Sequence, residues 1–163
     1  MKRILVFSDT HGSLKLCKRI IDRIPCDMII HAGDYVSDAQ ELKKLYPDKD
    51  ILYVKGNCDT FSYAPAYEIT ELDGVRIFIA HGHEQRVKYE HDYASMVRAA
   101  KEHNCTAAVF GHTHIEYAEE HDGVYLLNPG SAKYGGTYGV IEIDDGKPSI
   151  CFISEEPNSW VDI

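Results

Sequence analysis

The chain has 163 residues, 44% of them hydrophobic and 26% charged, which predicts one soluble globular domain over 1–163. The formal net charge of −9 argues against a surface that follows the phosphates of duplex nucleic acid. No apolar stretch approaches the roughly 18 to 20 residues of a membrane span, so no membrane partner and a cytoplasmic location are expected.

The first half of the chain predicts strands that alternate with helices. A buried strand is expected over 2–8, and Ser13 is positioned to cap the helix that follows. Strands at about 27–31 and 50–55 enclose a second helix at about 37–46. This βαβαβ order predicts parallel pairing with right-handed crossovers.

The second half changes character. Asp73-Gly74 lies between the strand-like runs 66–72 and 75–81, which is the strongest short hairpin signal. A helix is expected at about 90–103. Further strands are expected at 106–110, 115–118, 124–127, 137–143 and 149–153. Parallel units followed by antiparallel hairpins predict two sheets packed face to face with helices outside.

Residues that suit a transition metal directly follow five hydrophobic runs. The five segments are Asp9-Thr10-His11, Gly33-Asp34, Gly56-Asn57-Cys58-Asp59, His81-Gly82-His83 and Gly111-His112-Thr113-His114. The carboxyl ends of strands are the usual place for a site in an α/β fold. Each segment alone has a simpler reading as a turn, because Asp and Asn often close turns. Their joint occurrence at five strand ends favours a shared metal site.

The donor types narrow the choice of metal. Imidazoles combined with carboxylates and an amide oxygen suit Mn, Fe, Co, Ni or Zn better than Mg or Ca. The five cysteines have no paired CxxC spacing, which argues against a structural zinc site and a disulfide framework. Seven donors are too many for one ion and enough for two, so the sequence predicts a dinuclear hydrolytic site.

The ordered motifs DxH, GD, GNxD, HGH and GHTH resemble the calcineurin-like metallophosphoesterase superfamily. The GNCD form and the chain length are most similar to the small prokaryotic YfcE-like phosphodiesterases. The loop Asn128-Pro129-Gly130-Ser131 also resembles that branch. This resemblance implies a four-layered α/β/β/α sandwich, an α/β fold of two mixed β-sheets flanked by helices.

The same resemblance implies which residues bind two divalent ions. The first ion is assigned to Asp9, His11, Asp34 and His114, and the second to Asp34, Asn57, His81 and His112. Asp34 therefore bridges them, as a carboxylate can. Mn is the expected metal, with Ni, Fe, Co or Zn as alternatives. The expected catalytic residues are Asp34, Asn57 and His83, and His83 either orients a ligand or contacts the phosphate.

The expected reaction is attack of a metal-bound hydroxide on phosphorus, because metal coordination lowers the pKa of water from 15.7 to about 7. The metals and His83 would stabilise the developing charge. A small phosphodiester is the expected substrate, because a monoester would need a stronger cationic clamp than Arg86 and Lys88. The alternatives are a phosphomonoesterase acting on phosphoprotein or nucleotide, and a non-enzymatic scaffold similar to a retromer subunit on the same fold.

Cys58 is a departure from larger relatives, which carry a histidine there that assists the leaving group. Asp59, which orients that histidine in the relatives, has no assigned role in this chain. The thiol predicts a preference for good leaving groups. His31 is expected in the core or behind the ligands, and the surface is the expected place of His91, His103 and His121. Tyrosines in loops near Pro and Gly could form a substrate wall or a homo-oligomer interface: Tyr63, Tyr67, Tyr134 and Tyr138.

Overall fold

The computed structural model describes residues 1–155 and contains two five-stranded sheets. Residues 156–163, which the predicted domain includes, lie outside the described part. In spatial order the first sheet consists of β10 (Lys147–Ser154), β9 (Thr137–Asp144), β1 (Lys2–Phe7), β2 (Met28–His31) and β3 (Ile51–Tyr53). The second consists of β4 (Tyr67–Leu72), β5 (Val75–Ala80), β6 (Ala107–Val109), β8 (Val124–Asn128) and β7 (Tyr117–His121).

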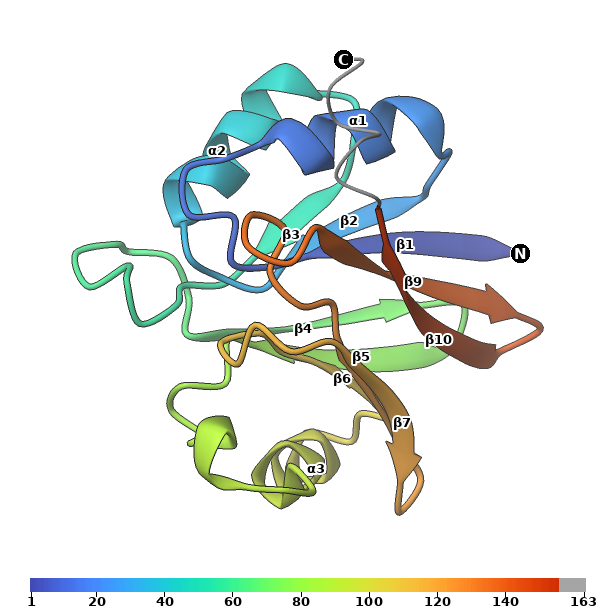
Figure 1. Cartoon of the computed structure of the whole chain (residues 1–163). Helices are drawn as coiled ribbons and strands as arrows, with labels where there is room; N and C mark the ends of the chain where they lie inside the picture. The colour runs from blue at the N-terminus through green and yellow to red at the C-terminus, as the bar shows by residue number, and fades with distance from the viewer. Residues whose placement is uncertain (156–163) are drawn as a thin grey trace.

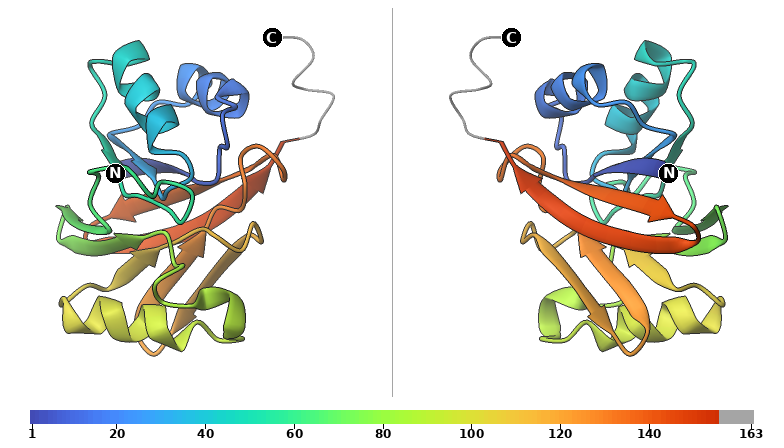
Figure 2. Two further views of the ribbon diagram at one scale, coloured as in Figure 1. Left: turned by 90° about the vertical axis from the view of Figure 1, so that its left-hand side faces the viewer. Right: turned by 90° about the vertical axis from the view of Figure 1, so that its right-hand side faces the viewer.

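The helices form the outer layers. Helices α1 (Lys15–Arg23) and α2 (Val36–Leu45) cover the first sheet, and α3 (Ala94–Glu102) covers the second. The side views show the order helix, sheet, sheet, helix (Figure 2). The predicted four-layered α/β/β/α sandwich is therefore confirmed. No helix within residues 1–155 has the length and apolar character needed to span a membrane.

Strand β1 explains how the layers are held together. Its side chains alternate between two faces, as in any strand. Ile4 and Val6 belong to the apolar cluster between the sheets, while Leu5 and Phe7 pack with the buried face of α1. All four are completely buried. A strand that is apolar on both faces must lie inside the sandwich, and β1 accordingly pairs with β2 and β9.

The strand directions create the site. β1, β2 and β3 are parallel to one another, and so are β5, β6 and β8. The carboxyl ends of the central strands consequently open at one edge of the sandwich, on the left in Figure 1. The loops that carry the polar segments all begin at this edge.

Three local expectations are wrong. Leu14, not Ser13, is the N-cap of α1, and no side chain caps the helix; Ser13 belongs to the preceding turn, in which its amide donates to the Thr10 carbonyl. The helix expected from residue 90 begins at Ala94, after a short 3₁₀ helix η1 (Val87–Tyr89). The strand expected at 115–118 begins and ends later in the chain, because β7 (Tyr117–His121) takes its position from antiparallel pairing with β8.

Candidate metal centre

Backbone hydrogen bonds tie the strand-end loops to one another. The Asp9 amide donates to the Gly33 carbonyl at 2.9 Å, and the His11 amide donates to the Asp34 carbonyl at 3.2 Å. In the second sheet, the Gly111 amide after β6 donates to the His81 carbonyl after β5 at 2.9 Å. These bonds bring segments that are far apart in the sequence into one rigid cluster.

Five of the seven expected metal ligands have a left-handed backbone, with φ values between 43° and 68°. They are Asp9, His11, Asp34, His112 and His114. Residues other than glycine adopt this conformation in only a few per cent of cases, at some cost in free energy. Such strain concentrates at functional sites, where the surrounding structure holds side chains in place.

The carboxylate of Asp9 lies at the centre of the cluster and is fully buried. Its Oδ2 accepts hydrogen bonds from the Ser8 hydroxyl at 2.6 Å and the His112 amide at 3.1 Å. Its Oδ1 has no hydrogen-bond partner. Instead, Oδ1 faces the Nε2 atoms of His114 at 3.2 Å, His11 at 3.6 Å and His81 at 3.8 Å. A buried carboxylate oxygen surrounded in this way needs a proton or a cation nearby.

Asp34 lies between two imidazoles. Its Oδ1 accepts the Cys58 amide at 3.0 Å, and its Oδ2 is 3.3 Å from His81 Nε2 and 3.9 Å from His11 Nε2. Burial alone would raise the pKa of Asp34, but the hydrogen bond and charge of His81, together with the Cys58 amide, hold that pKa well below its usual range. Asp34 is therefore ionised at neutral pH.

His81 is oriented by the backbone behind it. Its Nδ1 is 2.7 Å from the Ala32 carbonyl oxygen, which can only accept, so Nδ1 carries a hydrogen. Its Nε2 faces Asn57 Oδ1 at 3.1 Å and Asp34 Oδ2 at 3.3 Å, which are acceptors as well, so without a metal Nε2 also carries a hydrogen. Loss of that proton would leave a lone pair on Nε2 for a metal ion. Metal-binding histidines usually have this arrangement, with the second nitrogen donating to a carbonyl or carboxylate.

The donor set fits divalent metal ions. Ligand atoms of Asp9, His11 and His114 lie within 4.8 Å of one another, and so do those of Asp9, Asp34 and His81. His11 Nε2, like Asp9 Oδ1, is buried without a hydrogen-bond partner. The mixture of imidazole nitrogens and carboxylate oxygens is the type that Mn, Fe, Co, Ni and Zn accept.

His112 and His83 occupy the side of the cluster next to the second sheet. The His112 ring centroid is 5.1 Å from that of His81, and the His83 centroid is 5.5 Å from it. Burial lowers the pKa of His112 to about 4, and burial lowers that of His83 as well, so both rings are neutral at pH 7. Neither belongs to a three-residue donor group of the described residues. The assignment of all seven ligands to two ions therefore stays a prediction.

Glycines adjacent to the ligands let the loops approach closely. A Cβ at Gly56 would overlap with the Asp34 carboxylate, and one at Gly111 would overlap with the Ser8 hydroxyl and press on the Asp9 carboxylate. Both glycines directly precede segments that carry expected ligands. Their place in the sequence is explained by the space that these carboxylates need.

The structure gives Asp59 a role that sequence reasoning missed. Its Oδ2 accepts the amides of Gly56 at 2.8 Å and Asp34 at 3.1 Å, while its Oδ1 accepts that of Val36 at 3.0 Å. Asp59 thus joins the loop after β3 to the loop after β2. With both oxygens engaged, this carboxylate is not available to orient a side chain at position 58.

We expect Asp59→Asn to lower the free energy of unfolding by on the order of 3 kcal/mol, because an amide NH₂ group would face backbone N–H donors. Urea denaturation in the presence of a chelator measures this loss without a contribution from bound metal. The matched control is Asp48→Asn at an exposed position, which should change stability by less than about 0.5 kcal/mol. Equal stability of Asp59→Asn and wild type would show that the three hydrogen bonds do not hold the loops together.

Residues behind and beside the ligands complete the centre. The Ser131 hydroxyl donates to the Asp9 carbonyl at 2.8 Å, which links the loop of residues 128–131 to the ligand loop. Buried His31 accepts the Gly33 amide and contacts the Thr10 hydroxyl at 3.0 Å, behind the ligands as expected.

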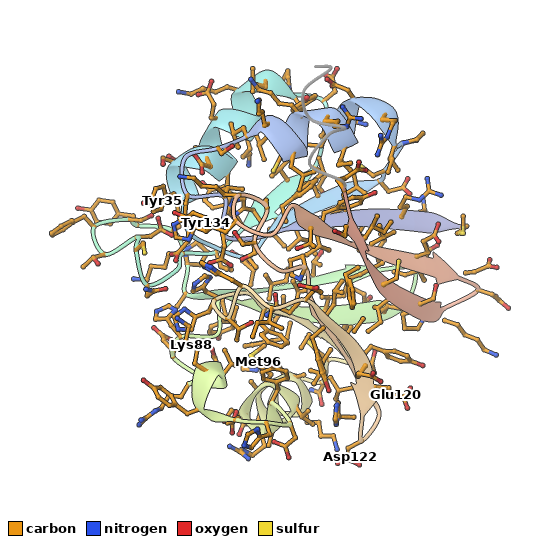
Figure 3. All side chains as sticks on the ribbon, in the orientation of Figure 1. Tyr35, Lys88, Met96, Glu120, Asp122 and Tyr134 are labelled. Carbon is orange, nitrogen blue, oxygen red and sulfur yellow. The ribbon has the colours of Figure 1, made fainter. Side chains whose placement is uncertain are left out.

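Tyr134 stacks on His114 with centroids 5.6 Å apart. Tyr35 meets His11 edge-on at 5.1 Å. Figure 3 shows both tyrosines at the same edge of the molecule.

The remaining aromatic side chains differ in burial. Tyr138 lies in the core, whereas Tyr63 is fully exposed. Tyr67 stacks on Phe78, and the half-buried ring of His103 also stacks there, in contrast to the expected solvated position of this histidine. Of the four loop tyrosines singled out in the sequence, Tyr134 is the one whose ring contacts expected ligands among the described residues.

Comparison with known proteins adds an independent line of evidence. The model of the calcineurin-like phosphoesterase superfamily domain matches residues 1–146. A probable metallophosphoesterase of Mycoplasma pneumoniae is 33% identical over 132 residues, which cover 80% of this chain and 79% of that protein. The phosphodiesterase YfcE of Escherichia coli is 25% identical over 173 residues, covering 88% of this chain and 89% of YfcE.

A solved structure agrees with these relatives. The crystal structure of a predicted phosphoesterase from Streptococcus pneumoniae superposes with a TM-score of 0.78 and 28% identity. The superposition covers 94% of this chain and 89% of that protein. The family match over residues 1–146 spans every loop of the candidate metal centre.

Proposed function

The chain belongs to the calcineurin-like phosphoesterase superfamily, as its motifs predict, and on that premise we propose that it hydrolyses a small phosphodiester with two divalent metal ions. One observation carries the proposal. The buried Asp9 Oδ1 faces three imidazole nitrogens and has no hydrogen-bond partner. Lone pairs that converge on one point are stabilised by a cation, and a cation there would lie beside any phosphate that enters the edge of the sandwich.

The proposed ligands fall on two sides of Asp34. Asp9, His11 and His114 would hold one ion with Asp34, and Asn57, His81 and His112 would hold the other with Asp34. The position of Asp34 Oδ2 between His11 and His81 supports its role as the shared ligand. Bound divalent ions supply an acidic water and neutralise phosphoryl oxygens.

The chain's own residues would position the ester. His83 is neutral and has a buried Nδ1 without a partner, so it is able to orient a neighbouring ligand or donate to a phosphoryl oxygen. Lys133 donates to the His11 carbonyl at 3.1 Å, which holds an ammonium group near the centre. Tyr35 and Tyr134 flank His11 and limit the access of water.

The supply of cations favours a diester over a monoester. A diester carries one negative charge, whereas a monoester carries close to two at neutral pH. Arg86 is placed over the Tyr89 ring, with its guanidinium carbon 5.3 Å from the centroid, and does not form a clamp with the centre. Lys88 lies on the second-sheet side of the site (Figure 3).

We therefore expect bis(p-nitrophenyl) phosphate to be hydrolysed at least about 10-fold faster than p-nitrophenyl phosphate, with the same leaving group and added Mn²⁺. Equal or higher monoesterase activity would favour the phosphomonoesterase alternative. The absence of any hydrolysis by protein that elemental analysis shows to hold two ions would favour the scaffold alternative.

The proximity of Cys58 to the proposed ligands supports a position facing the leaving group. Its Sγ is within 4.8 Å of ligand atoms of His11 and Asp34, although the residue is otherwise exposed. Burial of the thiol and its hydrogen bond to Asp34 raise the pKa of Cys58 to about 11. The thiol is therefore protonated at neutral pH and is only a weak donor.

We expect Cys58→His to increase the turnover of diesters with alkyl leaving groups by about 10²-fold, the lower end of the range for general acid catalysis. The lower end applies because Asp59 is not free to orient the new ring. Aryl esters should gain little, since their departure needs no proton. A leaving-group series with metal content measured in both proteins tests this. Equal gains across the series, or no gain for alkyl esters at full metal content, would exclude a leaving-group role for position 58.

A further inference from the structure

A groove of about 790 Å³ lies beside the candidate metal centre, between the start of α2 and the loop after β3. Tyr35 and Cys58 line its inner end. Both contact the centre, because the Tyr35 ring lies 5.1 Å from that of His11 and Cys58 Sγ lies within 4.8 Å of ligand atoms of His11 and Asp34. A diester whose phosphate lies at the metals would therefore extend one of its arms into this groove.

The groove offers aromatic faces and uncharged hydrogen-bonding groups. Its lining includes the rings of Tyr35, Phe61 and Tyr63 and the polar side chains of Ser37, Gln40 and Ser62. No lysine or arginine is among the lining residues. The carboxylate of Asp59 already accepts three backbone amides. The groove therefore has no partner for a second phosphate, but it suits a flat, neutral group with polar edges.

Two of these rings are unusually exposed. The exposed fraction is 96% for Phe61 and 104% for Tyr63. The loop that carries them projects from the left side of the molecule in Figure 1, next to the strand ends. Exposed aromatic rings beside a binding site provide stacking surfaces, and stacking tolerates any base because every base has a π-face.

We propose that this groove binds the nucleobase of a nucleoside phosphodiester whose phosphate lies at the candidate metal centre. The inference rests on the proposed phosphodiester hydrolysis. The base would stack on the exposed rings, while Ser37, Gln40 and Ser62 would bond to its polar edge. The absence of lysine and arginine from the lining favours a nucleoside arm over an arm that carries further phosphates.

Two substrates with the same leaving group and the same charge test the proposal. Thymidine 5′-(p-nitrophenyl) phosphate and methyl p-nitrophenyl phosphate differ only in the second arm. Base stacking predicts a kcat/KM that is roughly 5- to 100-fold higher for the thymidine ester. In the double variant Phe61→Ser/Tyr63→Ser, this ratio should fall by at least about 5-fold. Tyr89→Ser, which removes a ring that is 79% exposed outside the groove, should keep the wild-type ratio.

A binding measurement separates this inference from the proposed hydrolysis. In ¹⁵N-resolved NMR spectra of the metal-free protein, thymidine 5′-monophosphate should shift the amides of residues 35–40 and 58–64, whereas ribose 5-phosphate should not. These shifts, combined with no hydrolysis of either diester by the protein loaded with Mn²⁺, would overturn the proposed function and support the base site. Equal shifts by both ligands would overturn the base site and leave the proposed hydrolysis intact. So would a wild-type kcat/KM that is the same for the thymidine ester and the methyl ester. A third outcome would assign the groove to a second copy of the chain instead. In that case the wild type would sediment as a dimer and the double variant as a monomer, and both would have the same ratio of kcat/KM for the two esters.

Discussion

Replacing Asp34 with asparagine is expected to lower hydrolysis at least 10³-fold, further than any other single ligand change. Asp34 contacts imidazoles on both sides of the centre and is ionised, because His81 and the Cys58 amide keep its pKa low although burial opposes this. The substitution therefore removes a negative charge from both proposed ion sites at once. An amide placed there would also direct an N–H group toward one of the imidazoles.

The measurement is metal content by elemental analysis, together with the rate on bis(p-nitrophenyl) phosphate. We expect Asp34→Asn to retain less than one ion per chain and the wild type to bind two. Asp48→Asn, at an exposed turn, serves as the control and should resemble wild type in both respects. If Asp34→Asn keeps two ions and a near-normal rate, Asp34 does not bridge the metals.

The sequence predicts which loops come together because strand ends are encoded locally. A buried apolar run that stops at Asp or His places the polar residue at a sheet edge whatever the details of the loop. Parallel pairing then brings the edges together, as seen for Asp9 and Asp34 after β1 and β2. The late loop that contains Ser131 was found only by resemblance, since a serine hydroxyl that bonds the Asp9 carbonyl has no local pattern.

Other features depend on contacts that arise only in the folded chain. The left-handed backbone of His11 and His114 is imposed by the way the loops close on one another, and nothing in their own residue type requires it. The role of Asp59 also depends on the folded chain. Its sequence neighbours suggest a site residue, but its carboxylate accepts hydrogen bonds from three backbone amides. The late start of α3 follows from Tyr93, which caps the helix in a left-handed conformation.

Removal of the metals is expected to abolish hydrolysis while leaving the protein folded. The three apolar clusters contain none of the seven expected ligands, so they do not depend on a cation. Exhaustive chelation should therefore reduce activity below about 1% with an unchanged far-UV circular dichroism spectrum, and Mn²⁺ should restore the rate. Full activity in protein that is free of metal by elemental analysis would rule out the dinuclear proposal.

When the metals are removed, we expect His81 to take up a proton. Burial would lower the pKa of His81, but its hydrogen bond to Asp34 and the charges of Asp9 and Asp34 raise it overall. Since a metal ligand must lose that proton, metal affinity should fall as the pH drops below the raised pKa of His81 and level off above it. Calorimetric titration with Mn²⁺ in buffers of different ionisation enthalpy measures the protons released. If Mn²⁺ binding releases a proton from the wild type near neutral pH but not from His81→Asn, His81 is the group that carries the proton. If both proteins release the same number of protons, another group carries it.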